Sequence, residues 1–351
     1  MGLTEQAVEA LRTVPFPGLG RDIVALGYVK DIQERDGRAV VSIEMSTKLP
    51  EAADRIRQAA GDALDRAGVP HELEIQVRSP AAEAPAPEAP QPQPQPTPAL
   101  LQDVPVKIAV ASGKGGVGKS TVAVNLALAF ARQGGKVGLL DCDVYGPSVP
   151  LMMGMESERP EVRDGKLVPL SRYDVRTISI GYLIDRETPV IWRGPMAGKA
   201  LDQLMGEVDW TGVEMLILDL PPGTGDIQIT LAQKISLSGA VVVTTPQDVA
   251  LIDAAKGVSM FHKVDVSVLG IVENMSAFAC PHCGETTEIF RSGGGRREAE
   301  RLGIPLLGSI PIDPRIPVGG DTGVPIVVQD PDSAPGRAFL DAARAIRERI
   351  R

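Results

Sequence analysis

A glycine-rich stretch between an apolar run and a helix-forming run is the feature that most constrains this chain of 351 residues. Residues 112–121 read Ser-Gly-Lys-Gly-Gly-Val-Gly-Lys-Ser-Thr and fit the pattern G-x-x-x-x-G-K-S/T. The apolar run 106–111 predicts a strand before this stretch, and residues 122–132 predict a helix after it. This order places the loop at a helix N-terminus, where backbone N–H groups can bind phosphate.

The residues of this loop differ in what they offer a phosphate. The glycines let successive backbone N–H groups point into one concavity that can hold an anion. Lys119 supplies a positive charge for the β- and γ-phosphates, and the hydroxyl of Ser120 is placed to bind Mg²⁺. Lys114 is a second lysine within the loop and is not part of the minimal pattern.

A dinucleotide site is the rival interpretation of the same stretch. Residues 113–118 also spell G-x-G-x-x-G, and Asp141 follows a second apparent strand about twenty residues further on. The pair Lys119-Ser120 decides against it, because a lysine and a metal-binding hydroxyl suit a triphosphate, whereas a dinucleotide site mainly uses backbone there. We therefore expect a nucleoside triphosphate with Mg²⁺.

Composition and charge exclude several classes of protein. The formal net charge is −9 and no long basic tract is present, so we expect no nucleic-acid partner. No apolar run is long enough to cross a bilayer, and the first ten residues carry Glu5 and Glu9 where a secretory signal would be basic and apolar. Three cysteines are too few for a disulfide scaffold, which indicates a reducing compartment and predicts a cytoplasmic location.

A proline-rich segment predicts the main domain boundary. Residues 80–98 alternate proline with Ala, Glu and Gln, which leaves little apolar surface to pack and favours an extended tether over a docking motif. We expect a small α+β domain at 1–79, a linker at 80–103 and a nucleotide-binding domain at 104–351. In the small domain we expect strands at 22–31 and 38–45 around a turn at 36–37, a helix at 51–66 and a strand at 71–77.

The expected nucleotide-binding domain alternates strand-like with helix-like runs. Several apolar runs are continuous, as in the central strands of a mainly parallel sheet with helices on both faces, so the predicted fold class is α/β. The later expected strands are 136–140, 177–181, 215–219, 240–244, 268–273 and 306–310. Ligands of such sheets bind at the carboxyl ends of the strands, where we therefore look for site residues.

Polar side chains follow three of these strands. Asp141 and Asp143 come at the end of one, where one carboxylate can hold the metal shell and the other can orient an attacking water. Asp219 ends another and enters the turn 220–226, Leu-Pro-Pro-Gly-Thr-Gly-Asp, which suits a second metal-holding element. Turn formation is the alternative for Asp141 and Asp143. Asn274 follows a later strand and can contact a base or cap a turn.

Cys280 and Cys283 form a C-x-x-C pair that can bind one metal ion or cluster. A metal ion or cluster of this kind usually takes four thiolates. Two chains that each give this pair would therefore complete a site on the two-fold axis of a homodimer. A redox dithiol, a Zn knuckle and two unpaired thiols are the alternatives. His282 is interpreted as a loop residue, with a third ligand as the alternative, and Cys142 as a small buried residue.

These stretches together resemble the Mrp/ApbC family of iron–sulfur cluster carrier ATPases. That family belongs to the deviant phosphate-loop group of the Min and Par ATPases and the nitrogenase iron protein. The resemblance covers residues 104–351 and rests on 113–121, on Asp-Cys-Asp-Val-Tyr-Gly-Pro-Ser at 141–148, on 219–226, and on Asn-Met-Ser at 274–276 leading into the C-x-x-C pair at 280–283.

The resemblance implies a role for each matching residue. Lys114 would be a signature lysine that reaches the nucleotide of the partner subunit, and Asp143 would orient the water. Asn274 would contact adenine, and Cys280 and Cys283 would bind half of a bridging [4Fe–4S] cluster. The implied ATP-binding residues are Gly113, Lys114, Gly115, Gly116, Val117, Gly118, Lys119, Ser120, Thr121 and Asn274, the catalytic ones are Lys114, Lys119 and Asp143, and the Mg²⁺ ligands are Ser120, Asp141 and Asp219.

The first part of the chain resembles a small domain associated with iron–sulfur assembly that often precedes this ATPase. Many such domains carry a Cys just before a Pro after the hairpin, and this chain has Thr-Lys-Leu-Pro at 47–50 instead. We therefore expect a docking or dimer-supporting module in place of a cluster relay.

The resemblance predicts an ATP-hydrolysing carrier that receives a cluster from scaffold donors and transfers it to apoproteins. One alternative is a Min-like spatial switch that binds membranes through a terminal amphipathic helix. Residues 338–351 carry an apolar stripe with several Arg, which we expect to pack on the sheet instead. The other alternative is an ATPase whose cysteines clamp Zn²⁺ in a dimer.

Overall fold

The structure is a computed structural model that describes residues 2–16, 22–46, 50–78, 100–184, 194–280, 282–283, 285–291 and 293–350. The chain divides into two compact units, Met1–Gln93 and Pro94–Arg351, and each is described by itself. The predicted proline-rich tether at 80–98 lies outside the described residues, as does the segment 47–49.

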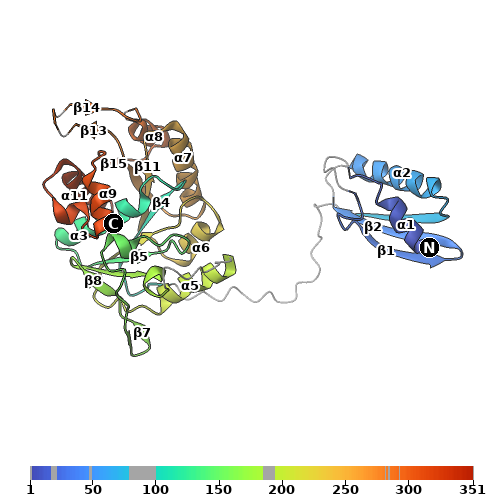
Figure 1. Ribbon diagram of the computed structural model, residues 1–351, viewed down its shortest axis with the longest axis horizontal. Coiled ribbons are helices and arrows are strands. Elements are labelled where there is room, and N and C mark those ends of the chain that lie inside the picture. Colours follow the sequence, from blue (N-terminus) through green and yellow to red (C-terminus); the bar gives the residue numbers. More distant parts are fainter. Residues whose placement is uncertain are drawn as a thin grey trace. The chain divides into compact units, whose positions relative to one another are not determined.

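The smaller unit packs two helices on a three-stranded sheet (Figure 1). The sheet has the order β1-β2-β3, with β1 antiparallel and β3 parallel to β2. Apolar side chains such as Leu11, Ile43, Ile56 and Leu64 form its core. The elements are α1 (Leu3–Leu11), β1 (Val29–Arg35), β2 (Arg38–Ser46), α2 (Pro50–Arg66) and β3 (His71–Arg78).

Two features of this unit differ from the prediction. The first strand was expected at 22–31, but β1 begins at Val29 because Asp22 starts a turn. The Asp22 carboxylate accepts the backbone N–H of Val24 at 3.1 Å and of Ala25 at 2.7 Å, which satisfies groups that a strand would pair. Helix α1 was not predicted.

The larger unit is built on an eight-stranded sheet with the order β15-β12-β11-β4-β10-β5-β9-β8. Every neighbouring pair is parallel except β8 with β9, which confirms the predicted α/β class. The strands are β4 (Val106–Ser112), β5 (Val137–Asp141), β8 (Leu170–Arg172), β9 (Val175–Ser179), β10 (Met215–Asp219), β11 (Gly239–Thr244), β12 (Val268–Glu273) and β15 (Leu306–Ser309).

Helices cover both faces of this sheet, with α3, α9 and α11 on one side and α6 and α7 on the other (Figure 1). The helices are α3 (Lys119–Arg132), α4 (Val149–Met152), α5 (Gly194–Gly206), α6 (Asp226–Lys234), α7 (Asp248–Lys263), α8 (Gly294–Leu302), α9 (Arg315–Thr322), α10 (Ile326–Gln329) and α11 (Ala334–Arg347). Two short hairpins, β6 (Val162–Arg163) with β7 (Lys166–Leu167) and β13 (Phe278–Ala279) with β14 (Thr286–Thr287), stand apart from the main sheet.

The strand predicted at 177–181 ends two residues earlier than expected. The run 177–181 was predicted as strand, but β9 ends at Ser179 and the short 3-10 helix Ile180–Tyr182 follows. The Ser179 hydroxyl accepts the backbone N–H of Gly181 at 3.1 Å, so a side-chain cap ends the extended backbone. Strand β8 at the sheet edge was not predicted.

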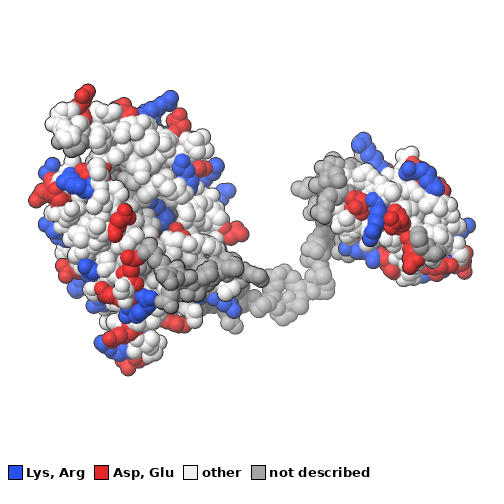
Figure 2. Space-filling model, viewed as in Figure 1, with Lys and Arg blue, Asp and Glu red and all other residues white. Residues whose placement is uncertain are grey.

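The C-terminal apolar stripe packs inside the molecule. Phe339 and Ile346 of α11 are fully buried, and the helix contacts α3 and β15. The Arg347 guanidinium lies 5.8 Å from the centre of the Phe130 ring. None of the helices in the described residues is long and apolar enough to cross a bilayer. On the face shown in Figure 2, basic and acidic side chains are interspersed.

Candidate functional site

The glycine-rich loop follows β4 and runs directly into α3, as the strand–loop–helix pattern predicted. Two of its glycines are required by geometry. Gly118 has φ +80°, and a Cβ there would lie 2.2 Å from the amide nitrogen of Asn274. A Cβ on Gly113 would lie 2.0 Å from the backbone oxygen of Asp253 in α7. The loop is therefore held between α7 and the end of β12.

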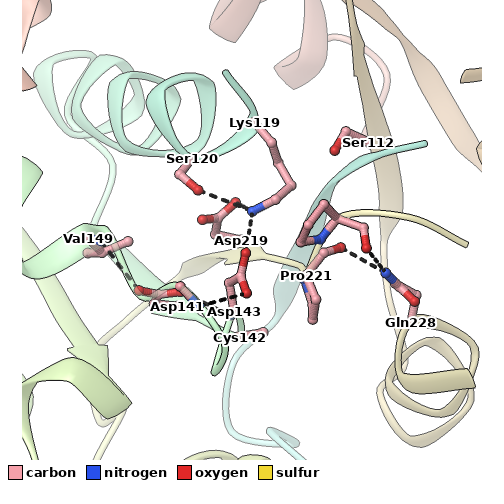
Figure 3. A network of polar contacts seen from close by, with 12 residues as sticks. Ser112, Lys119, Ser120, Asp141, Cys142, Asp143, Val149, Asp219, Pro221 and Gln228 are labelled. Carbon is pink, nitrogen blue, oxygen red and sulfur yellow. Dashed lines mark hydrogen bonds and ion pairs between the residues drawn. The ribbon is translucent and has the colours of Figure 1, made fainter. Parts of the chain in front are cut away.

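Lys119 lies in a buried acidic cluster at the carboxyl ends of β4, β5 and β10 (Figure 3). Its Nζ lies 2.5 Å from Oδ1 of Asp219, 3.1 Å from Oγ of Ser120 and 3.9 Å from Oδ2 of Asp143. These residues meet because β10 lies between β4 and β5, with Asp219 directly opposite Asp141. The structure thus brings the predicted loop lysine together with all three predicted aspartates.

Asp141 and Asp143 have different surroundings. Asp141 is fully buried, and its oxygens accept the backbone N–H of Asp143 at 3.0 Å, the Ser179 hydroxyl at 2.9 Å and the Val149 N–H at 3.4 Å. Both oxygens are therefore engaged in holding the segment after β5. Asp143 lies nearer the surface, at 9% exposure, and faces Lys119. Asp143 is thus better placed than Asp141 to meet a ligand.

Burial and the neighbouring Asp219 carboxylate raise the pKa of Asp141 to about 7 from its ordinary 3.8. A carboxyl whose pKa is higher in the folded state stabilises that state below about pH 4 and loses this contribution as the pH rises toward 7. Without nucleotide or metal, we expect the free energy of unfolding to be lower at pH 7.5 than at pH 5 by about 2–3 kcal/mol on this account.

Urea unfolding of the wild type and of Asp141→Asn at the two pH values measures this contribution. The variant keeps a neutral acceptor in place of the carboxyl, so its stability should change less between pH 5 and pH 7.5 than that of the wild type. Equal pH dependence in the two proteins would contradict the assignment to Asp141.

Asp219 has a free oxygen suited to a metal ion. Its Oδ2 is buried and makes no hydrogen bond within the described part of the chain, while Oδ1 accepts from Lys119. Burial raises the pKa of this carboxyl, against the lowering effect of Lys119. An unpartnered carboxylate oxygen beside the Ser120 hydroxyl fits the hard oxygen ligands that Mg²⁺ prefers. The residues present therefore fit Mg²⁺ through Ser120 and Asp219, with Asp141 as a support.

Gln228 is a site residue that the sequence analysis missed. Its Nε2 donates to the carbonyls of Pro221 at 2.9 Å and Pro222 at 2.8 Å (Figure 3). The Gly223 N–H donates to the Ser112 carbonyl at 2.9 Å. The turn after Asp219 is thereby tied to α6 and to the end of β4. A Gln in the first turn of the helix that follows a Pro-Pro turn was the signal in the sequence.

Gln228→Leu tests the role of this tie. The change leaves two proline carbonyls without their donor, and we expect a loss of about 1–3 kcal/mol in the free energy of unfolding. Turnover of ATP should fall more than nucleotide affinity, since the turn and not the glycine-rich loop is affected. Gln233→Leu on the same helix is the control. Unchanged stability and turnover in Gln228→Leu would show that the tie has no role.

Lys114 and Asn274, which were predicted to contact nucleotide, lie at the loop and make contacts within the protein. The Lys114 backbone carbonyl accepts from the Ser112 hydroxyl at 2.9 Å, and its ammonium makes no ion pair with any residue that the structure describes. The Asn274 amide donates to the Val117 carbonyl at 2.9 Å and is buried. The adenine contact of Asn274 stays a prediction.

The C-x-x-C pair lies on the β13–β14 hairpin, which Figure 1 shows at the edge of the larger unit near α8. Cys280 is half-buried and Cys283 is exposed, and the Cys280 N–H donates to the Glu285 carbonyl at 2.9 Å. Backbone N–H groups of Cys283 and His282 lower the pKa of the Cys280 thiol. Cys142 is fully buried, as predicted.

Among the residues with described placement, no group of three or more His, Cys, Asp and Glu side chains could hold a metal ion. One chain therefore presents two accessible thiols on this hairpin, half of the four that a cluster usually takes.

Comparison with known proteins matches both units. The family described as NUBPL iron-transfer P-loop NTPase matches residues 103–347, and the family described as iron-sulfur cluster assembly protein matches residues 4–77. The iron-sulfur cluster carrier protein of Haemophilus influenzae is 40% identical over 342 residues, which cover 97% of this chain and 90% of that protein. The Arabidopsis thaliana iron-sulfur protein required for NADH dehydrogenase, mitochondrial, is 52% identical over 237 residues, 67% of this chain and 75% of that one.

Solved structures agree with the fold of the larger unit. A nucleotide-binding protein of Archaeoglobus fulgidus, solved in complex with ADP, has a TM-score of 0.60 and 37% identity, and covers 68% of this chain and 93% of that chain. The cell division ATPase MinD of Pyrococcus furiosus has a TM-score of 0.51 at 23% identity, over 69% of this chain and 98% of that chain, and shows the fold alone. The resemblance stated from the motifs is confirmed: this chain belongs to the family of NUBPL-type iron-transfer P-loop NTPases.

Proposed function

We propose that this protein binds and hydrolyses ATP and carries an iron–sulfur cluster, which it receives from scaffold donors and transfers to apoproteins. The observation that carries the proposal is the pair of accessible thiols, Cys280 and Cys283, on a hairpin of the same unit that holds the phosphate-binding loop. Relatives named iron-sulfur cluster carrier protein support the cargo, among them the Escherichia coli protein at 55% identity over 240 residues.

In the proposed nucleotide site, the backbone of residues 113–121 cradles the phosphates of ATP. Lys119 turns from Asp219 toward the β- and γ-phosphates, since the ion pair of 2.5 Å and a phosphate compete for the same ammonium. Mg²⁺ bound by Ser120 and Asp219 would neutralise developing charge on the phosphates. Asp143 orients the attacking water, and Asp141 holds Asp143 in place through the bond to its backbone N–H.

In the proposed cluster site, each of two subunits gives Cys280 and Cys283 to one bridging [4Fe–4S] cluster on the two-fold axis of a homodimer. The exposure of the thiols and the absence of a third ligand among the described residues support a site completed by a partner. The cluster is cargo, so the site has to release it as well as bind it.

We propose that the smaller unit, over residues 1–79, serves docking or dimer support, and that the linker and the ATPase domain follow at 80–103 and 104–351. The match to the iron-sulfur cluster assembly family over residues 4–77 supports a separate module. Leu101 is buried with the larger unit and Leu100 pairs with Ile235, so the last residues of this linker pack with the ATPase domain.

Anaerobic reconstitution with iron and sulfide tests the proposal. We expect a dimer to bind iron and sulfide and to show a broad visible absorption. The rate of cluster transfer to an apoprotein that requires a cluster should change when Mg-ATP is present. Protein purified without oxygen should contain iron and not zinc, which separates a carrier from a Zn clamp. Protein that stays monomeric and free of iron in every nucleotide state would refute the proposal.

A further inference from the structure

Asn274 joins the phosphate-binding loop to the segment that carries the cysteines. Its side chain is 5% exposed, and its Nδ2 donates to the Val117 carbonyl at 2.9 Å. The amide lies so close to the loop that a Cβ on Gly118 would lie 2.2 Å from it. The Asn274 backbone N–H donates to the Thr244 carbonyl at 2.8 Å, which holds the residue at the end of the sheet. A buried amide therefore links the loop to the end of β12.

The chain from Asn274 to Cys280 is tied to the body at successive points. The Ser276 N–H and hydroxyl both donate to the Ile310 carbonyl, at 2.9 and 3.0 Å. The Ile312 N–H donates to the Ala277 carbonyl at 2.7 Å, and β13 then leads to Cys280. Residue 274 and the first cysteine are therefore joined by a short segment that hydrogen bonds hold along its length.

Met275, between these ties, adopts a backbone conformation that its side chain does not favour. Its φ is +57°, in the left-handed region, and it is not a glycine. Such a residue is strained and keeps its conformation when surrounding contacts impose it. The hydrogen bond from the Asn274 side chain on one side and the Ser276 hydrogen bonds on the other are such contacts. Loss of the Asn274–Val117 hydrogen bond therefore allows the Met275 backbone to relax.

We propose that Asn274 is a positioning residue that couples the nucleotide state of the loop to the position and thiol accessibility of the Cys280–Cys283 hairpin. A loop that closes around phosphates moves the Val117 carbonyl, and the bond to Asn274 transmits this movement past Met275. The inference rests on the proposed function for what the two thiols bind. The coupling itself concerns the thiols alone, and it can be measured without iron.

Thiol labelling in the full-length, iron-free protein under anoxia tests the coupling. Cys142 is fully buried, so a thiol reagent in the folded protein reports Cys280 and Cys283, and Cys280→Ser/Cys283→Ser gives the background. Rates are compared without nucleotide, with Mg-ADP and with a non-hydrolysable Mg-ATP analogue, each at saturation established by a binding measurement. The test variant is Asn274→Asp, which keeps the shape and removes the donor.

Asn125→Asp is the matched control. Asn125 is 3% exposed, and its Nδ2 donates to the Thr121 carbonyl at 2.8 Å, so the variant also removes a buried amide donor beside the loop. Its oxygen accepts the Val327 N–H at 3.2 Å in α10, and neither of its two hydrogen bonds reaches the described residues of the cysteine hairpin. Asn274→Ser is the second test variant, and thermal melts establish that each protein is folded.

In the wild type and in Asn125→Asp, we expect nucleotide to change the labelling rate about fivefold or more, and in Asn274→Asp less than about twofold. An Asn274→Asp protein that binds nucleotide and keeps the wild-type change would overturn the inference, as would a wild-type rate that saturating nucleotide leaves unchanged. If Asn274→Asp fails to bind nucleotide, the thiol-labelling rate measured without nucleotide decides. Labelling of Asn274→Asp about twofold faster than labelling of the wild type and of Asn125→Asp supports the inference, and an equal rate overturns it. Failure of the wild type to bind iron would refute the carrier function and leave the labelling result standing.

Discussion

Lys114→Ala is expected to lower ATP turnover about 1000-fold while nucleotide affinity falls about tenfold or less. The two lysines of the loop have different surroundings. Lys119 is ion-paired with Asp219 inside its own chain, whereas the Lys114 ammonium has no ion-pair partner within the described residues. A cation that meets the phosphates from a partner subunit matters most as negative charge develops on the departing γ-phosphate, so its loss affects turnover more than binding.

Two comparison variants show whether the effect of Lys114→Ala comes from losing a charge at the nucleotide site or from losing any lysine. Lys136→Ala removes an exposed lysine paired with Glu214 and should leave turnover unchanged. Lys119→Ala should abolish nucleotide binding, because it removes the ammonium at the start of α3 that we propose to bind the β- and γ-phosphates.

Mixing two inactive proteins shows whether Lys114 acts across subunits. Lys114→Ala and Asp143→Asn each lack one group, and a mixed dimer has one site with Asp143 from its own chain and Lys114 from the partner. Activity restored to about one quarter of the wild type fits random pairing with one complete site in each mixed dimer. A mixture that stays inactive although the subunits exchange, or normal turnover in Lys114→Ala, would contradict a lysine supplied by the partner.

Cys280→Ser is expected to lower the iron bound after anaerobic reconstitution about tenfold or more, and Cys283→Ser to do the same. In a bridging site, one substitution per chain removes two of four thiolates, and the hydroxyl that replaces each is a far poorer ligand for iron. Iron, sulfide and visible absorption per dimer measure the loss. Thermal stability of the iron-free variants should match the wild type, because Cys283 is exposed and Cys280 half-buried on a short hairpin.

Cys142→Ala is the matched control within the chain. Cys142 is fully buried, and burial raises the pKa of its thiol well above the ordinary value, so it stays protonated and does not serve as a ligand. This variant should bind wild-type amounts of iron. Equal iron in Cys280→Ser and the wild type would remove the cysteine assignment, and loss of iron in Cys142→Ala would place the cluster near the nucleotide instead.

Much of the site could be predicted because its signals are local in the sequence. The loop at 112–121 specifies its own conformation through glycines and its place through the flanking strand and helix. Strands such as Met215–Asp219 and Val268–Glu273 were predicted with their observed limits, because continuous apolar runs between turn residues leave few other choices. The C-x-x-C spacing likewise predicts two thiols on one short loop.

Contacts between distant segments could not be predicted. The different surroundings of Asp141 and Asp143 depend on Ser179, which lies 38 residues further along the chain. The close approach of Gly113 to Asp253 and the tie from Gln228 to the Pro-Pro turn depend on how α7 and α6 pack. The start of β1 at Val29 was missed because the Asp22 turn competes with a strand pattern that looks complete.

The sequence alone determined the fold class, the strand–loop–helix around the glycine-rich stretch and the residues proposed to meet nucleotide and metal, because spacing along the chain sets which side chains share a strand end or a loop. The tertiary structure decided which carboxylate keeps a free oxygen and which acts as a support. It also decided that the bond from Asn274 to Val117 joins the loop to the cysteine hairpin. That bond spans 157 positions in the chain, and a contact at such a separation follows from packing and not from local pattern.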